Sequence, residues 1–226
     1  MVFKSFCDSL SAAVATWAFV MSAFFAIHDH PVHIPRAWRL ASTAAGFSRK
    51  AGRINGRLLG QDGTVSERPI RLFGDPVLRT PCDAVGKFDE ALASLVADLE
   101  ETVSLPGRAG LAANQIGVSL RVFAYNVDGQ IGHLVNPVIE AIEGDQEEDE
   151  GCLSIPGLWY PLLRAQYARA RGVDRLGQPA VIEGEGLLAR CIQHEIDHLN
   201  GRLFVDCLSG SVREQAMRDL RERYLS

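Results

Sequence analysis

The sequence predicts an α+β fold, in which mixed, mainly antiparallel strands pack around one central helix and an amphipathic helix closes the C-terminus. Three observations support this class. Apolar residues recur at helical spacing in some segments, while others are rich in β-forming residues. An Asp-Gly pair separates two strand-like segments, as in a hairpin. The elements also lack the regular βαβ alternation of a parallel sheet.

The first predicted elements run from a strand to a helix. Pro69 to Phe73 reads as a short strand, followed by a turn-rich passage. From Phe88 to Val103 apolar residues recur on one arc of about 100°, which predicts an amphipathic core helix. Pro106-Gly107 ends that helix. Gly110 to Gly117 is then expected to form a compact apolar segment that also contains amide side chains.

A hairpin is predicted next. Leu120 to Val127 is rich in β-forming residues, Asp128-Gly129 supplies the turn, and Gly132 to Ile142 offers the partner strand. The acidic run from Glu143 to Glu150 is interpreted as a solvated loop.

The C-terminal third predicts two strands and two helices. Gln166 to Val173 and Ala180 to Glu183 are the strands, and a helix is expected from about Glu185 to Leu199. A short apolar run, Leu203 to Val205, precedes an amphipathic helix from about Val212 to Tyr224.

Length and charge bound the domain organisation. With 226 residues the chain has room for one domain of about 150 residues and an appendage. We expect an N-terminal extension at residues 1–65 and a catalytic domain at 66–226. Residues 1–61 contain seven basic and two acidic residues, whereas residues 62–226 contain 16 basic and 26 acidic ones. Direct nucleic-acid binding is not expected of so acidic a domain, because such binding requires clustered Lys and Arg.

The N-terminal extension allows three interpretations. Leu10 to Ile27 is an uncharged, largely apolar run of 18 residues, near the lower limit for a membrane anchor. His30 to Gln61 contains no acid, which is typical of an organelle transit peptide. Alternatively, the working protein starts near Val65 and the upstream residues are leader, which favours a bacterial cytoplasmic enzyme. The five scattered cysteines fit a reducing compartment, and the cytoplasm is the location we expect.

The strongest local signal is the H-E-x-x-H motif that runs from His194 to His198. Two His four residues apart on a helix can bind one metal ion, and Glu195 between them can reach a bound water. A helical wheel places this motif on a buried face that includes Leu187. It places Arg190, Gln193 and Asp197 on the opposite, solvent side.

Two ligands leave the predicted metal site incomplete. Catalytic zinc sites usually have three protein ligands and a water. In ordinary H-E-x-x-H proteases the third ligand is a downstream Glu or His. Residues 199–226 contain no His, and their acids lack a familiar spacing. The third ligand is therefore expected upstream.

Three motifs occur along the chain: Gly110-Leu-Ala-Ala-Asn-Gln-Ile-Gly117, Glu150-Gly-Cys-Leu-Ser-Ile-Pro-Gly157 and Gln193-His-Glu-Ile-Asp-His-Leu199. Their order and approximate spacing resemble those of the peptide deformylases. The resemblance covers roughly Arg68 to Leu208. It implies removal of the formyl group from N-formylmethionyl peptides, with release of formate.

The resemblance also implies the site residues. Cys152, His194 and His198 would bind one divalent metal ion, which is Fe2+ in the family. Zn2+, Ni2+ or Co2+ also suit a thiolate and two imidazoles. The Gln115 side-chain amide and the Leu153 backbone N–H would stabilise the oxyanion. Glu195 would carry protons, and Gly110 would let the substrate approach the backbone.

The chain departs from the family pattern at one point and leaves other residues open. Arg108 replaces the first glycine of the usual G-x-G and is either a substrate contact or a solvated loop residue. Leu158, Trp159 and Tyr160 would line a methionine pocket or pack in the core. Cys191 is interpreted as a small core residue.

Two other functions fit the residues less well. A zinc peptidase lacks the downstream ligand it would need, and a catalytically silent, ribosome-associated relative would not need an intact site. A Cys–His nucleophilic dyad at Cys152 would leave the helix motif without a purpose. The expected partners are nascent N-formylmethionyl peptides and, more remotely, the ribosome, and the chain is expected to be a monomer.

Overall fold

The computed structural model describes residues 53–54, 57–58 and 68–224. In its first part, strand β1 (Arg53–Ile54) pairs antiparallel with β2 (Arg57–Leu58). The apolar run Leu10 to Ile27 and nearly all of the predicted extension lie outside the described residues. Within the described ranges, no helix is long and apolar enough to cross a membrane.

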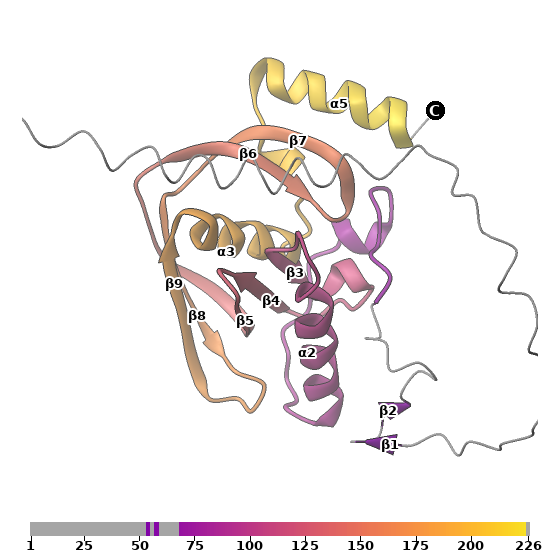
Figure 1. The fold of residues 1–226 in the computed structure, drawn as a ribbon, viewed down its shortest axis with the longest axis vertical. Helices are drawn as coiled ribbons and strands as arrows, with labels where there is room; N and C mark the ends of the chain where they lie inside the picture. The colour runs from indigo at the N-terminus through magenta and orange to yellow at the C-terminus, as the bar shows by residue number, and fades with distance from the viewer. Residues whose placement is uncertain (1–52, 55–56, 59–67, 225–226) are drawn as a thin grey trace, which may run out of the picture. The chain divides into compact units, whose positions relative to one another are not determined.

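A five-stranded antiparallel sheet with the order β3-β4-β5-β8-β9 forms the centre of the described chain (Figure 1). The predicted Asp128-Gly129 turn is present, with φ angles of 53° and 77°, as a tight hairpin requires. All four strands predicted between Leu120 and Glu183 are confirmed, with small differences at their ends. The five strands of the sheet are β3 (Gly110–Ala112), β4 (Val122–Val127), β5 (Gln130–Glu143), β8 (Tyr167–Val173) and β9 (Pro179–Glu185), and the predicted four are β4, β5, β8 and β9.

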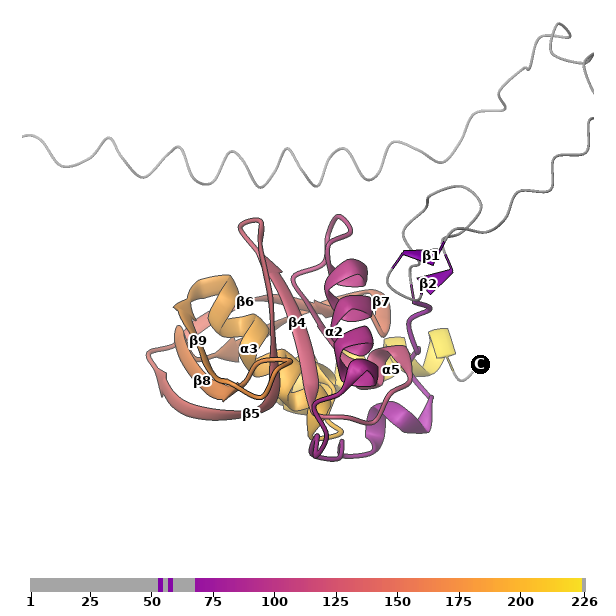
Figure 2. The ribbon, with the colours of Figure 1, turned by 90° about the horizontal axis from the view of Figure 1, so that it is seen from below.

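Two helices cover the two faces of this sheet, α2 (Glu90–Val103) and α3 (Gly186–Leu199). Successive side chains of a strand point to opposite faces, so Val122 packs in the cluster with α2 and Phe123 in the cluster with α3. Figure 2 shows the two helices on either side of β4. The helix predicted from Phe88 begins at Glu90, because Asp89 caps it by accepting hydrogen bonds from two backbone N–H groups.

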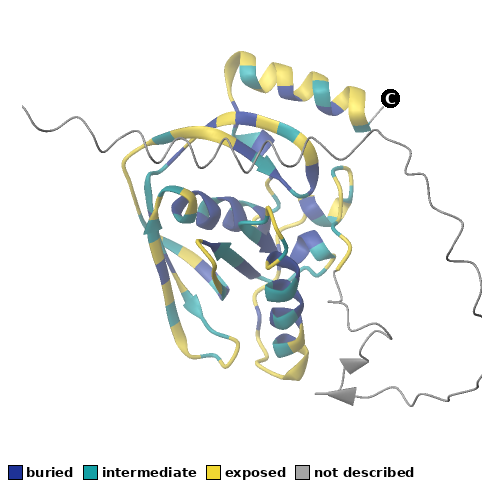
Figure 3. Cartoon of the chain, in the orientation of Figure 1, coloured by how far each residue is buried: buried dark blue, intermediate teal, exposed yellow. Residues whose placement is uncertain are grey.

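A second layer covers the other side of α3. It is the hairpin of β6 (Gln146–Cys152) and β7 (Ile155–Arg164), followed by α4 (Phe204–Cys207) and α5 (Gly210–Tyr224). Figure 1 shows the hairpin between α3 and α5, and Figure 3 shows α3 largely buried while much of α5 is exposed. The central helix is thus enclosed by strands on both sides, which confirms the predicted α+β architecture.

The hairpin corrects the prediction of a solvated loop from Glu143 to Glu150. Most of that run is strand β6, and its partner β7 was not predicted. Glu147, Glu148 and Asp149 are exposed, as a loop would have them, but Glu150 is buried. Pairing with β7 supplies the stabilisation that the charged sequence lacks by itself, so tertiary context overrides the local preference.

The predicted first strand, Pro69 to Phe73, is also wrong. This segment forms isolated backbone hydrogen bonds to two different parts of the chain instead of a β-ladder. The Arg71 N–H donates to the Gln115 carbonyl at 2.7 Å, and the Phe73 N–H donates to the Ser154 carbonyl at 2.8 Å. Two short 3-10 helices complete the described fold, η2 (Pro76–Arg79) and η3 (Ala113–Ile116).

Candidate metal centre and catalytic residues

Three side chains from two elements converge at one point. Cys152 Sγ lies 3.2 Å from His198 Nε2, which lies 3.2 Å from His194 Nε2, and the three candidate ligand atoms are all within 4.8 Å of one another. Tetrahedral coordination with ordinary metal–sulfur and metal–nitrogen bonds places such atoms roughly 3.3–3.6 Å apart. The donor set and its spacing therefore fit one metal ion of the size of Zn2+ or Fe2+.

The local fold explains why these ligands meet. His194 and His198 are one turn apart on α3, so both imidazoles project from the same face. Cys152 ends β6, where the register shifts so that it pairs with Ile155 at the tip of the hairpin. All three ligands are at most 9% exposed. Because the hairpin lies over α3, the thiol reaches the helix although the residues are more than 40 positions apart.

Glu195 lies buried beside the convergent ligands. It is 3% exposed, and burial raises its pKa to about 7. Its Oε2 atom has no hydrogen-bond partner among the described residues. A carboxyl group with a pKa near neutrality can both accept and return a proton at physiological pH.

Gly110 makes room for this carboxylate. A Cβ atom at position 110 would lie 2.2 Å from Glu195 Oε1 and 2.7 Å from Cys191 Sγ. No real side chain fits at these distances. The glycine of the first motif therefore has a steric reason that concerns the proton carrier directly, in addition to the substrate approach expected of it.

Gln115 is held with its amide nitrogen toward the metal ligands. Its Oε1 accepts a hydrogen bond from the Ala112 N–H at 2.8 Å, so Nε2 points the other way, 3.6 Å from Cys152 Sγ and 3.2 Å from Ser154 Oγ. Leu153 directly follows the cysteine and is partly buried. The fold thus places both predicted oxyanion donors next to the ligand cluster.

Glu150 is the main site residue that sequence reasoning missed. It is 3% exposed, and its Oε1 lies 2.7 Å from His194 Nδ1. Its carboxylate also accepts hydrogen bonds from Arg164, at 2.7 and 3.0 Å, and from Arg190, at 3.0 Å. Burial alone would raise the pKa of Glu150, but the bonds from His194 and Arg164 hold that pKa well below its usual range. A carboxylate at Nδ1 fixes the imidazole so that Nε2 faces the metal position.

The same network corrects the predicted solvent face of α3. Arg190 is 6% exposed and bonds to Glu150 and to the Leu162 carbonyl, while Asp197 accepts a 2.7 Å hydrogen bond from Arg164. The wheel identified the ligand face correctly but assumed that the other side meets water. Instead the β6–β7 hairpin covers it. Leu187, which was assigned to the buried arc, is 40% exposed near the start of the helix.

The other residues singled out near the motifs lie in different environments. Arg108 is partly buried, and its guanidinium donates a hydrogen bond to the Thr102 carbonyl near the end of α2. Cys191 is 4% exposed and donates to the Ala109 carbonyl, as a core residue would. Tyr160 is buried and bonds to Asp219, whereas Trp159 is 60% exposed.

Comparison with known proteins gives one consistent family. The model of the family described as polypeptide deformylase matches residues 67–214. A peptide deformylase of Acidothermus cellulolyticus is 59% identical over 155 residues, which are 69% of this chain and 86% of the relative.

Solved structures agree. A peptide deformylase from Legionella pneumophila aligns with a TM-score of 0.65 and 44% identity over 70% of this chain and 95% of that one. The enzyme from Thermus thermophilus aligns with a TM-score of 0.64 and 42% identity over 68% and 93%.

Proposed function

The chain belongs to the polypeptide deformylase family, and on that premise we propose that Cys152, His194 and His198 bind the one metal ion of its active site. As a peptide deformylase it removes the formyl group from the N-terminal formylmethionine of nascent peptides. The observation that supports this ligand set is the convergence of one thiol and two imidazole nitrogens, with the buried Glu195 alongside. When bound, the ion supplies Lewis-acid polarisation and a nucleophilic water.

The protein groups around the ion then have separate tasks. We assign the Gln115 amide and the Leu153 N–H to the oxyanion that develops on the formyl oxygen, where each donor is worth roughly 3 kcal/mol. Glu195 takes a proton from the attacking water and delivers it to the nitrogen of the departing amine. Water and the formamide are thereby converted to formate and a free amino terminus.

Gly110 and Glu150 support this chemistry without taking part in bond making. The bare backbone at Gly110 leaves space for the Glu195 carboxylate and for the substrate main chain. Glu150 holds His194 through Nδ1. We propose Fe2+ as the native ion, with Zn2+, Ni2+ or Co2+ as the alternatives that the same donors accept.

Formate release distinguishes the proposal from a zinc peptidase. Protein purified without oxygen and loaded with Fe2+ is expected to release one formate per formyl-Met-Ala and to leave the internal peptide bond intact. Cys152→Ser should lose most of its metal in dialysis, while Cys207→Ser, a cysteine outside the ligand cluster, should keep it. Cleavage of the internal bond, or full metal retention by Cys152→Ser, would contradict the assignment.

We further propose residues 66–226 as the catalytic domain, a cytoplasmic location, and a monomeric state that gel filtration would test.

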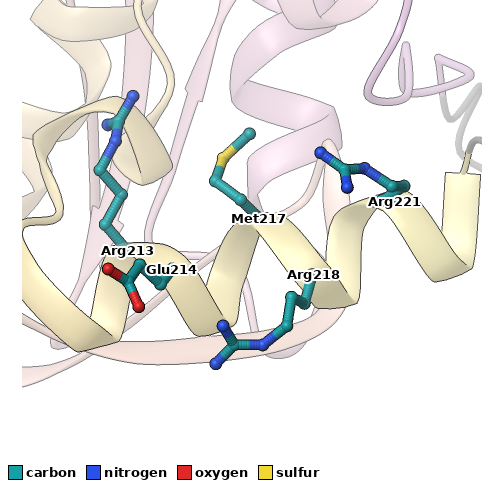
Figure 4. Close-up of a pocket in the computed structure, with 5 residues that line it drawn as sticks. All are labelled: Arg213, Glu214, Met217, Arg218 and Arg221. Carbon is teal, nitrogen blue, oxygen red and sulfur yellow. The ribbon is translucent and has the colours of Figure 1, made fainter.

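Ribosome association is part of the same proposal. A shallow groove on α5 is lined by Arg213, Glu214, Met217, Arg218 and Arg221 (Figure 4), so basic side chains surround an exposed apolar one. Co-sedimentation with ribosomes, compared with a Met217→Glu variant, tests whether this groove is used.

A further inference from the structure

The proposed oxyanion donor Gln115 lies on η3 (Ala113–Ile116), a 3-10 helix of four residues. Two backbone hydrogen bonds of 3.0 Å close this short helix, donated by the N–H groups of Gly117 and Val118. Hydrogen bonds in a 3-10 helix have poorer geometry than those in an α-helix, and such helices occur as short pieces. The position of Gln115 therefore depends on the bonds that η3 makes to neighbouring elements.

Asn114 ties η3 to the helix that contains the two histidines. Its side-chain Nδ2 donates to the backbone carbonyl of His198 at 2.7 Å, between residues 84 positions apart in the sequence. Asn114 is 0% exposed and His198 is 1% exposed, so this hydrogen bond is shielded from water and correspondingly strong. The opposite orientation of the amide would bring two acceptor oxygens together. The bond thus holds η3 at a fixed distance from the end of α3.

The next residue, Gln115, is bonded toward the other element that supplies a metal ligand. Its Nε2 lies 3.2 Å from Ser154 Oγ and 3.6 Å from Cys152 Sγ, at the tip of the β6–β7 hairpin. The Arg71 N–H also holds the Gln115 carbonyl, but from a segment without a ligand. Two consecutive amide side chains therefore connect η3 to both sources of the metal ligands, Asn114 to α3 and Gln115 to the hairpin.

We propose that Asn114 is a positioning residue for the oxyanion donor, acting through Gln115. The inference rests on the proposed function, because it requires the Gln115 amide to donate to the oxyanion. The hydrogen bond to the His198 carbonyl sets where that amide lies relative to α3, and Asn114 itself does not touch the reacting atoms. A displacement of about 1 Å in a group of this kind can cost about 10²-fold in rate.

A leucine at position 114 separates this positioning role from a role in stability. The His198 carbonyl also accepts a hydrogen bond from the Gly201 N–H at 3.0 Å, so it stays bonded without Asn114. Asn114 Oδ1 has no hydrogen-bond partner among the described residues, so its removal leaves no group unpaired. Asn114→Leu is similar in shape and should unfold in urea close to wild type, while it loses the bond between η3 and α3.

Arg121→Met is the matched control. Arg121 Nη1 donates to the Leu199 carbonyl at 3.3 Å, and that carbonyl also accepts from the Cys82 N–H at 2.9 Å. Like Asn114, Arg121 gives a side-chain hydrogen bond to one of the last carbonyls of α3, and the carbonyl keeps a backbone donor. Arg121 directly precedes β4 and is not part of η3. Its loss should therefore leave kcat unchanged.

The kinetic test measures kcat and KM for formyl-Met-Ala on the metal-loaded full chain, with the metal content determined for each variant. Asn114→Leu should lower kcat about 10-fold at unchanged KM and metal content, and Asn114→Ala, which removes the same donor, should do the same. Gln115→Ala should lower kcat about 10²-fold or more. The double variant Asn114→Leu with Gln115→Ala should be no slower than Gln115→Ala, because no amide remains to be positioned.

A second readout does not depend on turnover. In isotope-labelled, Zn2+-loaded protein, nuclear magnetic resonance resolves the side-chain amide protons of Gln115, which are identified by their loss in Gln115→Ala. These signals should shift in Asn114→Leu, because the environment of the amide changes, and should keep their wild-type positions in Arg121→Met. Wild-type positions in Asn114→Leu would show that Asn114 does not place the amide.

The two levels of the proposal fail differently. If wild type releases no formate, or if Gln115→Ala keeps wild-type kcat, the proposed function or its oxyanion assignment is wrong and the inference falls with it. If Gln115→Ala is slow but both Asn114 variants keep wild-type kcat, the positioning role alone is refuted. It is also refuted if the losses of Asn114→Leu and Gln115→Ala multiply in the double variant, or if Arg121→Met slows turnover as much as Asn114→Leu does.

Discussion

Replacement of Glu150 by Gln tests the buried network in the greatest detail, because one carboxylate supports two separate features. It accepts hydrogen bonds from Arg164 and Arg190, whose side chains are each 8% exposed, and it holds His194 Nδ1. In Glu150→Gln, Arg164 keeps Asp197 as a counter-charge. Arg190 keeps the Leu162 carbonyl, which carries no charge, and its Nη2 already has no partner among the described residues.

The expected loss of stability follows from Arg190, which keeps no counter-charge in Glu150→Gln, whereas Arg164 does. Leaving a buried cation without its counter-charge costs about 3–5 kcal/mol in unfolding free energy. With a urea dependence of at most about 3 kcal/mol per M, the midpoint should fall by at least roughly 1 M. Metal affinity should fall about 10- to 100-fold as well, because an uncharged amide replaces the carboxylate that orients His194.

A double variant separates the two roles. Glu150→Gln combined with Arg190→Met removes the orphaned cation and should recover about half of the lost stability. It should not recover metal affinity, because His194 still lacks its carboxylate. Urea unfolding in the presence of a chelator measures the first quantity, and competition with a metal indicator measures the second. If Glu150→Gln alone has wild-type stability and wild-type metal affinity, the reasoning is refuted.

Two further predictions concern Gly110 and pH. Gly110→Ala must displace the Glu195 carboxylate, so kcat should fall by about 10²-fold or more at unchanged metal content. Gly86→Ala, where a Cβ meets nothing within 4 Å, should have unchanged kinetics. Equal kinetics of the two variants would count against the steric role of Gly110. Because the folded-state pKa of Glu150 is lowered, its contribution to stability is present above the ordinary Glu pKa of about 4.3 and is lost as pH falls below it. The stability difference between wild type and Glu150→Gln should therefore shrink as pH falls from about 4 in urea titrations, and a difference that grows over that range would contradict this sign.

Local sequence signals were sufficient for the three longer helices, α2, α3 and α5, and for most of the central sheet. The apolar period of α2, the Asp128-Gly129 turn and the motif on α3 each act within a few residues, so pattern alone identifies them. The wheel also found the ligand face of α3. These features depend on backbone geometry that is the same in any fold.

The β6–β7 hairpin could not be predicted in this way, because its stability comes from contacts distant in sequence. Glu147 and Asp149 face water and suggest a loop, while Glu150 and Arg164, 14 residues apart, meet only once the strands pair. The sequence feature that pointed to the hairpin was Arg190. An Arg on the side of a helix away from the sheet either faces solvent or forms an ion pair with a second layer of the protein, and a helical wheel does not distinguish these two cases.

The most direct measurement of the central claim is formate release by Glu195→Gln at equal metal content. The substitution keeps the size of the side chain but removes the group that accepts the proton, so the variant should hold one metal ion per chain, as wild type does. It should release formate from formyl-Met-Ala about 10²- to 10⁴-fold more slowly. Wild-type turnover by the metal-loaded variant would show that Glu195 is not the proton carrier and would contradict the mechanism assigned to this site.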